Sequence, residues 1–162
     1  MAAVDYFLKI DGVDGESQDK ANKSWIDLQS FSWGATNTGS SQTGGGGGSG
    51  KVAVQDFHFT MFHNNASPKL MLACASGEHI KSATLICRKA GKTQQEFLKY
   101  QLSDILVSSY QTGGSAGSDS IPVDQISINF SKIEHHYKPQ KADGTLGAAT
   151  IAGWDAKQNV KV

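Results

Sequence analysis

The chain has 162 residues and a mass of 17.2 kDa, which is the size of one domain. Its 15 Lys and Arg residues balance its 15 Asp and Glu residues, so the formal net charge is zero. This balance argues against a protein that binds nucleic acid or an anionic membrane, because both usually present a basic surface. Low net charge does little to oppose self-association, so an assembling protein fits these numbers.

The sequence carries no targeting signal that we recognise. No apolar stretch approaches the roughly 18 residues that a membrane-spanning helix needs, so we expect no membrane insertion. The N-terminus, MAAVDYFLKIDG, has no basic segment followed by an apolar one, which predicts that no secretory signal peptide is present. The two cysteines, Cys74 and Cys87, form no disulfide framework and indicate thiols in a reducing cytosol.

Several segments have the pattern of β-strands. Two runs, 24–33 and 52–62, change the phase of their alternation in the middle, which indicates a bulge or a strand buried on both faces. Bulges commonly curve a sheet toward closure. Four other segments alternate apolar and polar residues with the period of two that half-buried strands show: 4–10, 83–89, 96–102 and 124–132.

One short helix is expected over residues 68–76. Ser67 supplies an N-cap, Pro68 fits the first helical position, and Gly77 stands where a left-handed C-terminal residue belongs. Strands with Gly-rich turns and one helix predict a mainly β sandwich or barrel, in a single domain over residues 1–162.

The last part of the chain has the pattern of a loop followed by a strand. Residues 139–150 are poor in large apolar side chains and predict a surface loop. Residues 151–162 then close the chain as a final strand anchored by Trp154.

Two glycine-rich segments resemble catalytic motifs but fail in context. Residues 45–51, GGGGSGK, match a phosphate-binding loop up to Val52, where a Mg²⁺-binding hydroxyl is needed. A strand pattern follows that loop, although phosphate binding uses a helix N-terminus. Residues 113–117, GGSAG, match a nucleophile elbow, yet Pro122 and another strand pattern follow. We therefore expect neither nucleotide binding nor hydrolase chemistry.

The histidines do not suggest a metal site. His135 and His136 are adjacent, so on a strand they point to opposite faces. His58 and His63 straddle a strand end, and no Cys or carboxylate stands at a ligand spacing from them. We expect no catalytic residue, no metal and no cofactor, and therefore a protein that is not an enzyme.

Two classes of function remain. One is a structural subunit that assembles through its strand edges, which pair with other chains unless something blocks them. The alternative is a monomeric β-sandwich that binds a carbohydrate or peptide on an aromatic platform. Trp25, Trp33 and Trp154 are the candidates for such a platform, although their apolar strand context favours the core.

Longer stretches carry a resemblance to a known family. In chain order they are GGGGGSGKVAVQDFHF, SPKLMLACASGEHI, ATLICRKAG, YQLSDILVSSYQTGGSAG and YKPQKADG followed by GWD. Their order and spacing resemble the Hcp family, the haemolysin-coregulated proteins of bacterial type VI secretion systems. The resemblance covers nearly the whole chain.

The resemblance implies a fold and a function. Hcp-like proteins are compact β-barrels of two sheets with one flanking helix, and six copies close into a hexameric ring with a central channel. Rings stack into a tube that a contractile sheath drives outward behind a VgrG-type spike, and the channel carries effector proteins. The implied protein is made in the cytoplasm and secreted by this machine. Because the chain ends at Val162, we expect no C-terminal effector extension.

The resemblance also implies a stacking loop. In Hcp-like proteins an extended loop, here about residues 35–51, reaches toward the adjoining ring. Glycines allow a backbone to approach another surface closely. The expected ring-stacking residues are Gly44, Gly45, Gly46, Gly47, Gly48, Gly50 and Lys51. The sequence leaves open which residues line the channel and which cargo it carries.

Overall fold

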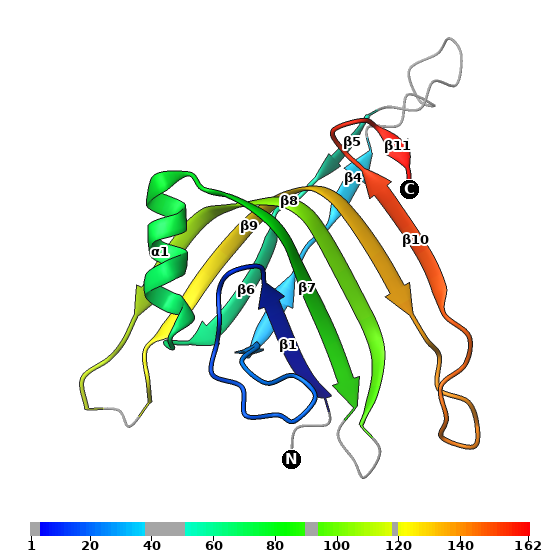
Figure 1. Ribbon diagram of the computed structural model, residues 1–162, viewed down its shortest axis with the longest axis horizontal. Helices are drawn as coiled ribbons and strands as arrows, with labels where there is room; N and C mark the ends of the chain where they lie inside the picture. Colours follow the sequence, from blue (N-terminus) through cyan, green and yellow to red (C-terminus); the bar gives the residue numbers. More distant parts are fainter. Residues whose placement is uncertain (1–3, 38–50, 90–93, 118–119) are drawn as a thin grey trace.

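The computed structural model describes residues 4–37, 51–89, 94–117 and 120–162. These residues form one helix, α1 (Ala66–Ser76), and eleven strands (Figure 1). The strands are β1 (Val4–Ile10), β2 (Ile26–Leu28), β3 (Ser30–Ser32), β4 (Ala35–Asn37), β5 (Val52–Val54), β6 (Phe57–Phe62), β7 (His79–Lys89), β8 (Gln95–Gly113), β9 (Val123–Tyr137), β10 (Thr150–Asp155) and β11 (Val160–Lys161). The predicted mainly β class with one short helix is confirmed.

The four segments with a period of two all lie in strands. Residues 4–10 are β1 itself, whereas the other three are parts of the longer strands β7, β8 and β9. The simple alternation breaks where the register shifts, between Cys87 and Arg88 and again between Val107 and Ser109.

Nine strands form one curled antiparallel sheet. Seven of them follow the order β11-β10-β9-β8-β7-β1-β2, and the other two lie off this path, with β6 paired to β9 and β3 paired to β6. Strand β9 is long enough to pair with two neighbours on its second edge. Its first half pairs with β6, with Phe57 opposite Ile128, and its second half pairs with β10, with Trp154 opposite Ile133. Figure 1 shows β8 and β9 arching from the α1 side of the molecule toward β10.

The two phase changes mark places where the chain changes its pairing partner. At Gln29 the chain leaves β2, which pairs with β1, and enters β3, which pairs with β6. Residues 55–56 separate β5, which pairs with β4 in a two-stranded ribbon, from β6 in the main sheet. The expectation of a bulge or a doubly buried strand is therefore wrong at both places.

The expected barrel is not closed by hydrogen bonds. The ladder is interrupted at Gln29, so the main sheet curls without a continuous circuit of paired strands. The second sheet consists of β4 and β5 alone. The architecture is thus one curled sheet with a small ribbon attached.

The helix begins two residues earlier than predicted. Ser67 is not its N-cap: the Asn64 side chain accepts a hydrogen bond from the Ala66 N–H at 2.8 Å, and the Ser67 hydroxyl accepts from the Asn64 N–H at 2.9 Å. The C-terminus matches the prediction, because Gly77 adopts a left-handed φ of 66° and donates its N–H to Ala73.

The core lies on one face of the curled sheet and is completed by Leu70 and Ala73 of α1. Burial of these apolar side chains is the main force that holds the sheet and the helix together. The largest fully buried side chains are Leu8, Ile10, Ile26, Phe57, Phe59, Met61, Leu70, Leu85, Leu102, Ile105, Ile126 and Ile128.

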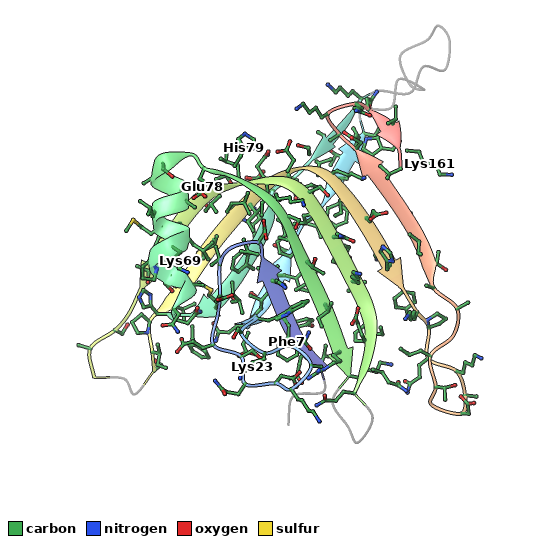
Figure 2. The ribbon with its side chains drawn as sticks, in the orientation of Figure 1. Phe7, Lys23, Lys69, Glu78, His79 and Lys161 are labelled. Atoms are coloured by element: carbon green, nitrogen blue, oxygen red, sulfur yellow. The ribbon has the colours of Figure 1, made fainter. Side chains whose placement is uncertain are left out.

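Residues 14–25, which we call the covering segment, lie over the opposite face of β1 and β7. Arg88 of β7 makes two hydrogen bonds to the Asp19 carboxylate, at 2.7 and 2.9 Å, and a third to Asn22. Its guanidinium also lies 4.8 Å from the centroid of the Phe7 ring. Figure 2 labels Phe7 on β1 and Lys23 in the covering segment. This buried ion pair fixes the segment to the sheet.

The C-terminal prediction needs one correction. Residues 140 and 146 form an isolated bridge within the predicted loop of 139–150, and the described residues after it form two short strands, β10 and β11, rather than one. The turn at 156–159 contains Asn159 with a φ of 57°, a conformation that asparagine tolerates.

Candidate functional site

The predicted stacking residues Gly44–Gly48 and Gly50 lie outside the described residues. Lys51 is described: it is exposed and stands directly before β5. The β4–β5 ribbon carries this segment, and its last pair toward it is Asn37 opposite Val52. Figure 1 shows the ribbon extending away from α1. The glycine-rich motif is followed by strand β5, whereas a phosphate-binding loop leads into a helix.

The second glycine motif also lacks the context of a catalytic loop. Gly113 ends β8, Gly117 adopts a φ of 81°, and the next described element is strand β9. A nucleophile elbow leads from a strand into a helix. The segment is therefore a connection between two antiparallel strands.

One edge of the main sheet is blocked by the chain itself. The covering segment folds back on itself beside the start of β2: the Gly15 N–H donates to Ser24 O at 2.8 Å and the Ser17 N–H donates to Trp25 O at 3.0 Å. Directly after β2, the Gln29 N–H donates to Thr60 O of β6 at 2.9 Å. Gly15 approaches so closely that a Cβ there would lie 2.6 Å from Trp25 O. Covering an edge in this way prevents it from pairing with another chain.

The opposite edge is open. Strand β10 pairs with β9 along its length. On its other side β11 and Val162 cover Gly153, Trp154 and Asp155, with the Val162 N–H donating to Gly153 O at 3.2 Å. The open residues 150–152, Thr-Ile-Ala, are uncharged, and Ile151 is 57% exposed. An uncharged open edge is a template for another strand or another subunit.

The face of the sheet opposite the core carries a neutral polar surface over β3, β6, β9 and β8. Its side chains stand in cross-strand rows, and those of β6, β8 and β9 line a groove of about 390 Å³. Two contacts order it: Ser30 to Thr60 at 2.6 Å, and Ser127 to His58 at 2.5 Å. We call this set the neutral face: Ser30, Ser32, His58, Thr60, Ser109, Gln111, Gln125 and Ser127.

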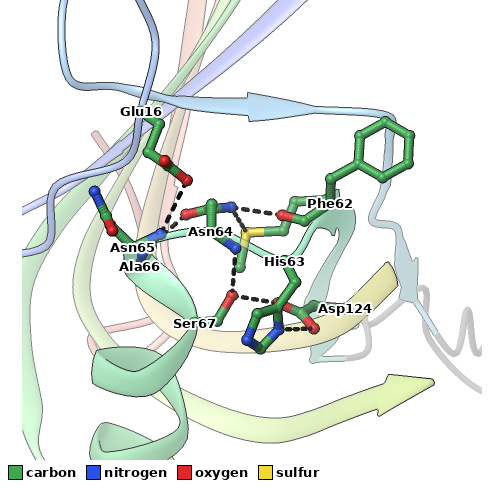
Figure 3. Close-up of polar contacts among 9 residues, drawn as sticks. Glu16, Phe62, His63, Asn64, Asn65, Ala66, Ser67 and Asp124 are labelled. Atoms are coloured by element: carbon green, nitrogen blue, oxygen red, sulfur yellow. Dashed lines mark hydrogen bonds and ion pairs between the residues drawn. The ribbon is translucent and has the colours of Figure 1, made fainter. Parts of the chain in front are cut away.

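A buried polar cluster joins β6, α1 and β9 (Figure 3). The Ser67 hydroxyl donates to the Asp124 carboxylate at 2.5 Å, and His63 Nδ1 lies 3.1 Å from the other oxygen. Burial favours a higher pKa for Asp124, but the hydrogen bonds from Ser67, Thr112 and His63 outweigh it and hold the pKa below its ordinary value.

The geometry of this cluster indicates a structural role rather than a catalytic one. Ser67 donates to Asp124 rather than to His63, so the imidazole is not placed to take the hydroxyl proton as a base in a catalytic triad would be. The sequence offered no signal for it, because Ser67 and Asp124 are 57 residues apart.

The sequence analysis predicted the orientation of His135 and His136. His135 and His136 pair with Ala152 and Ile151 of β10, so they point to opposite faces of the sheet. Burial, together with the neighbouring His136, lowers the pKa of His135, whose ring lies 4.6 Å from that of Tyr100. Within the described ranges, no group of three or more His, Cys, Asp or Glu residues could hold a metal ion.

The tryptophans do not form an exposed platform in the part of the chain that the structure describes. Trp33 packs edge-on against Tyr100 and Phe130, with ring centroids 5.6 and 6.4 Å apart. Trp25 and Trp154 are also partly buried. No described helix is long and apolar enough to cross a bilayer.

Comparison with known proteins identifies the family. The sequence matches the family described as "Type VI secretion system effector, Hcp" over residues 7–137. Protein hcp1 of Pseudomonas aeruginosa is 46% identical over 161 residues, which cover 98% of this chain and 99% of that protein.

Solved structures agree with this match. The crystal structure of Hcp1 from Salmonella typhimurium has a TM-score of 0.82 and 34% identity, over 99% of this chain and 100% of that one. The structure of a type six secretion system protein has a TM-score of 0.93 and 31% identity over the same shares.

The fold and these comparisons together define the class of the protein as a mainly β protein of a type VI secretion system. The chain belongs to the Hcp family, the tube proteins of type VI secretion systems. The resemblance seen in the sequence is thereby confirmed, and the carbohydrate- or peptide-binding alternative is not supported.

Proposed function

We propose that this chain is a single-domain ring subunit: six copies close into a hexamer, rings stack into a tube, and the tube is exported with effector proteins in its channel. The observation that carries the proposal is the difference between the two ends of the main sheet. Segments of the same chain lie beside β2, whereas the β10 edge is open at residues 150–152. A contact that joins two different surfaces generates a ring when its rotation closes.

The neutral face supports a role as the channel lining. The neutral face carries hydroxyls, amides and one imidazole over three neighbouring strands and β3, and the Asp56 carboxylate, which accepts hydrogen bonds from Ser108 and Asn129, borders it. Such a surface stays hydrated and offers neither a strong field nor an apolar patch to a passing protein. It therefore suits a water-filled channel through which different cargo proteins move.

Stacking of rings is assigned to Gly44–Gly48, Gly50 and Lys51. Their composition supports the role, because a glycine backbone can approach a neighbouring surface closely. Stacking is a head-to-tail contact and propagates without limit once it begins. A VgrG-type spike and a contractile sheath are the further partners, and export from the cytoplasm needs no N-terminal signal in this scheme.

Electron microscopy of the purified protein tests the proposal. The wild-type chain is expected to show rings end-on and stacked rings from the side. Replacing Gly46 and Gly47 by Asp is expected to keep the rings but shorten the stacks, because like charges and side chains crowd the contact. Ala75→Asp with Ser76→Asp adds the same charge on exposed α1 positions and is expected to stack normally.

Two results would count against it. Absence of rings in the wild-type protein contradicts the proposed assembly as a whole. Unchanged stacks in the Gly46 and Gly47 variant contradict only the role of the loop.

A further inference from the structure

A small pocket with a basic lining lies on the side of the molecule away from α1. It is formed where the start of β8 pairs with the end of β9, and Figure 1 shows these two strand ends far from the helix. Two lysines, one histidine, one glutamate and two apolar residues line it: Glu96, Phe97, Leu98, Lys99, His136 and Lys138. The pocket shares no residue with the neutral face or with the glycine-rich segment, so it can be tested independently of the proposed assembly.

The three basic side chains of the pocket are neighbours on one face of the sheet. Lys99 of β8 stands directly opposite His136 of β9. Lys138 follows two residues after His136, so the two side chains point to the same face, and the Lys138 N–H donates to Phe97 O at 2.9 Å. Opposite Cβ atoms are about 5 Å apart, and those two residues along a strand are about 7 Å apart. One small ligand can therefore contact all three side chains.

These side chains have nitrogen atoms without hydrogen-bond partners within the described residues. The ammonium groups of Lys99 and Lys138 make no hydrogen bond or ion pair there, although Lys99 is only partly exposed. His136 Nε2 is almost closed to water and also has no partner in that part of the chain. Nearly all buried polar atoms in proteins are hydrogen-bonded. An orphan nitrogen beside two unpaired cations therefore points to an acceptor from outside the chain.

The balance of charge around the pocket is positive. Glu96 is the one acidic side chain of its lining; it is exposed, stands opposite Arg88 of β7, and forms no ion pair with either lysine of the pocket. Lys89 adds a cation nearby, because its ammonium lies 5.5 Å from the centroid of the Phe97 ring. Three lysine charges thus stand against one carboxylate, and this local field favours an anion.

The size of the pocket and its three basic groups select the kind of anion. Its volume of about 140 Å³ is below the roughly 300 Å³ at which pockets for drug-sized ligands begin. A phosphate group is small and presents three acceptor oxygens, one for each basic side chain, whereas a carboxylate presents two. Lysine stems are flexible and their ammonium donors rotate, so they can turn toward such a group.

We propose that this pocket binds a phosphate group through Lys99, His136 and Lys138. The two ammonium groups donate charge-assisted hydrogen bonds, which are stronger than those between neutral groups. The imidazole supplies the third donor when Nε2 carries a proton. Inorganic phosphate and a phosphate ester are the two sources of this group, because both present the same oxygens.

Calorimetric titration of the wild-type protein at constant ionic strength tests the site, with inorganic phosphate and phenyl phosphate as the probes. Saturable binding of inorganic phosphate is expected. Phenyl phosphate carries the same group on an apolar body. Tighter binding of phenyl phosphate identifies an ester as the better ligand, and weaker binding identifies the free ion; both results support the site.

Three variants locate the binding. Lys99→Gln with Lys138→Gln is expected to weaken phosphate binding at least about tenfold, because hydrogen bonds from charged groups typically contribute more than that factor. Lys69→Gln with Lys81→Gln removes the same charge from exposed positions, of which Lys69 lies on α1 at the other end of the molecule (Figure 2), and is expected to bind like wild type. Glu96→Gln removes the negative charge beside the ligand and is expected to tighten binding severalfold.

Three results would overturn the proposal. They are no saturable binding of either probe to the wild-type protein, an equal loss in the pocket variant and in the Lys69 and Lys81 control, and unchanged binding in Glu96→Gln. Far-ultraviolet circular dichroism checks that each variant is folded, and Lys99→Gln alone replaces the double variant if that protein is not. These outcomes do not depend on the oligomeric state, which the solution mass reports separately.

Discussion

Replacing Gly15 by Ala is expected to release the covering segment from the β2 edge. A Cβ at this position would lie 2.6 Å from Trp25 O and 2.7 Å from the Ile26 Cα. Both are backbone atoms, so the clash cannot be relieved by turning a side chain. The segment and the strand have to move apart at this point.

The magnitude follows from the contacts that such a movement breaks. The hydrogen bonds from Gly15 to Ser24 and from Ser17 to Trp25 are lost or lengthened, at about 1 kcal/mol each. Ser17 is buried, and its packing is disturbed as well. We expect a loss of about 3 kcal/mol in the free energy of unfolding, which corresponds to a decrease of roughly 10 °C in Tm for a chain of this size.

Urea unfolding followed by tryptophan fluorescence measures the effect, with Trp25 as a local reporter. Gly113→Ala is the matched control, because a Cβ there meets nothing within 4 Å and Gly113 does not have a positive φ. We expect the control to stay within about 0.5 kcal/mol of the wild-type protein. A Gly15→Ala protein as stable as this control would refute the reasoning.

Three further predictions concern titratable groups. Burial raises the pKa of the Cys87 thiol to about 12. A thiol reagent at pH 8 should therefore modify the partly exposed Cys74 first and Cys87 only on unfolding, and equal modification rates at the two thiols would contradict this. His135 has a lowered pKa in the folded state, so stability should fall as pH drops below about 6.5, where only the unfolded chain gains this proton. The His135→Gln variant should lose less stability over this pH range than the wild-type protein, and identical pH profiles of the two proteins would contradict the prediction. The hydrogen bonds from Arg88 lower the pKa of Asp19, so the stability that they contribute is present at pH values above the ordinary carboxyl pKa and is lost in acid. The stability difference between Asp19→Asn and wild type should therefore shrink from pH 7 to pH 3, as acid unfolding curves can measure.

Local patterns in the sequence predicted most of the strands. Strand β1 has the predicted bounds because its alternation is regular over seven residues. The end of α1 was also predictable, since Gly77 needs only its own left-handed conformation. These features depend on residues that are close together in the chain, and the sequence shows them directly.

Features that depend on distant residues could not be read in this way. The phase change at Gln29 looks like a bulge in the sequence, but its cause is the pairing of β2 with β1 and of β3 with β6. Ser67 looks like a helix cap in the sequence, but its hydroxyl donates to Asp124 of β9, which is 57 residues away. Pairing partners and buried polar contacts of this kind are set by the tertiary fold.

The candidate functional surfaces also differ in how far they depend on local or on distant residues. The glycine-rich stacking loop was visible as composition, and its role remains a prediction. The neutral face was not visible in the sequence, because its side chains come from several strands that meet only in the folded sheet.

The solution mass of the purified wild-type chain tests the central claim most directly. Light scattering behind size exclusion, at micromolar concentration, is expected to give 6 × 17.2 = 103.2 kDa for a hexameric ring. A mass of 17.2 kDa that persists as the concentration is raised would contradict the claim that this chain is built to close into rings.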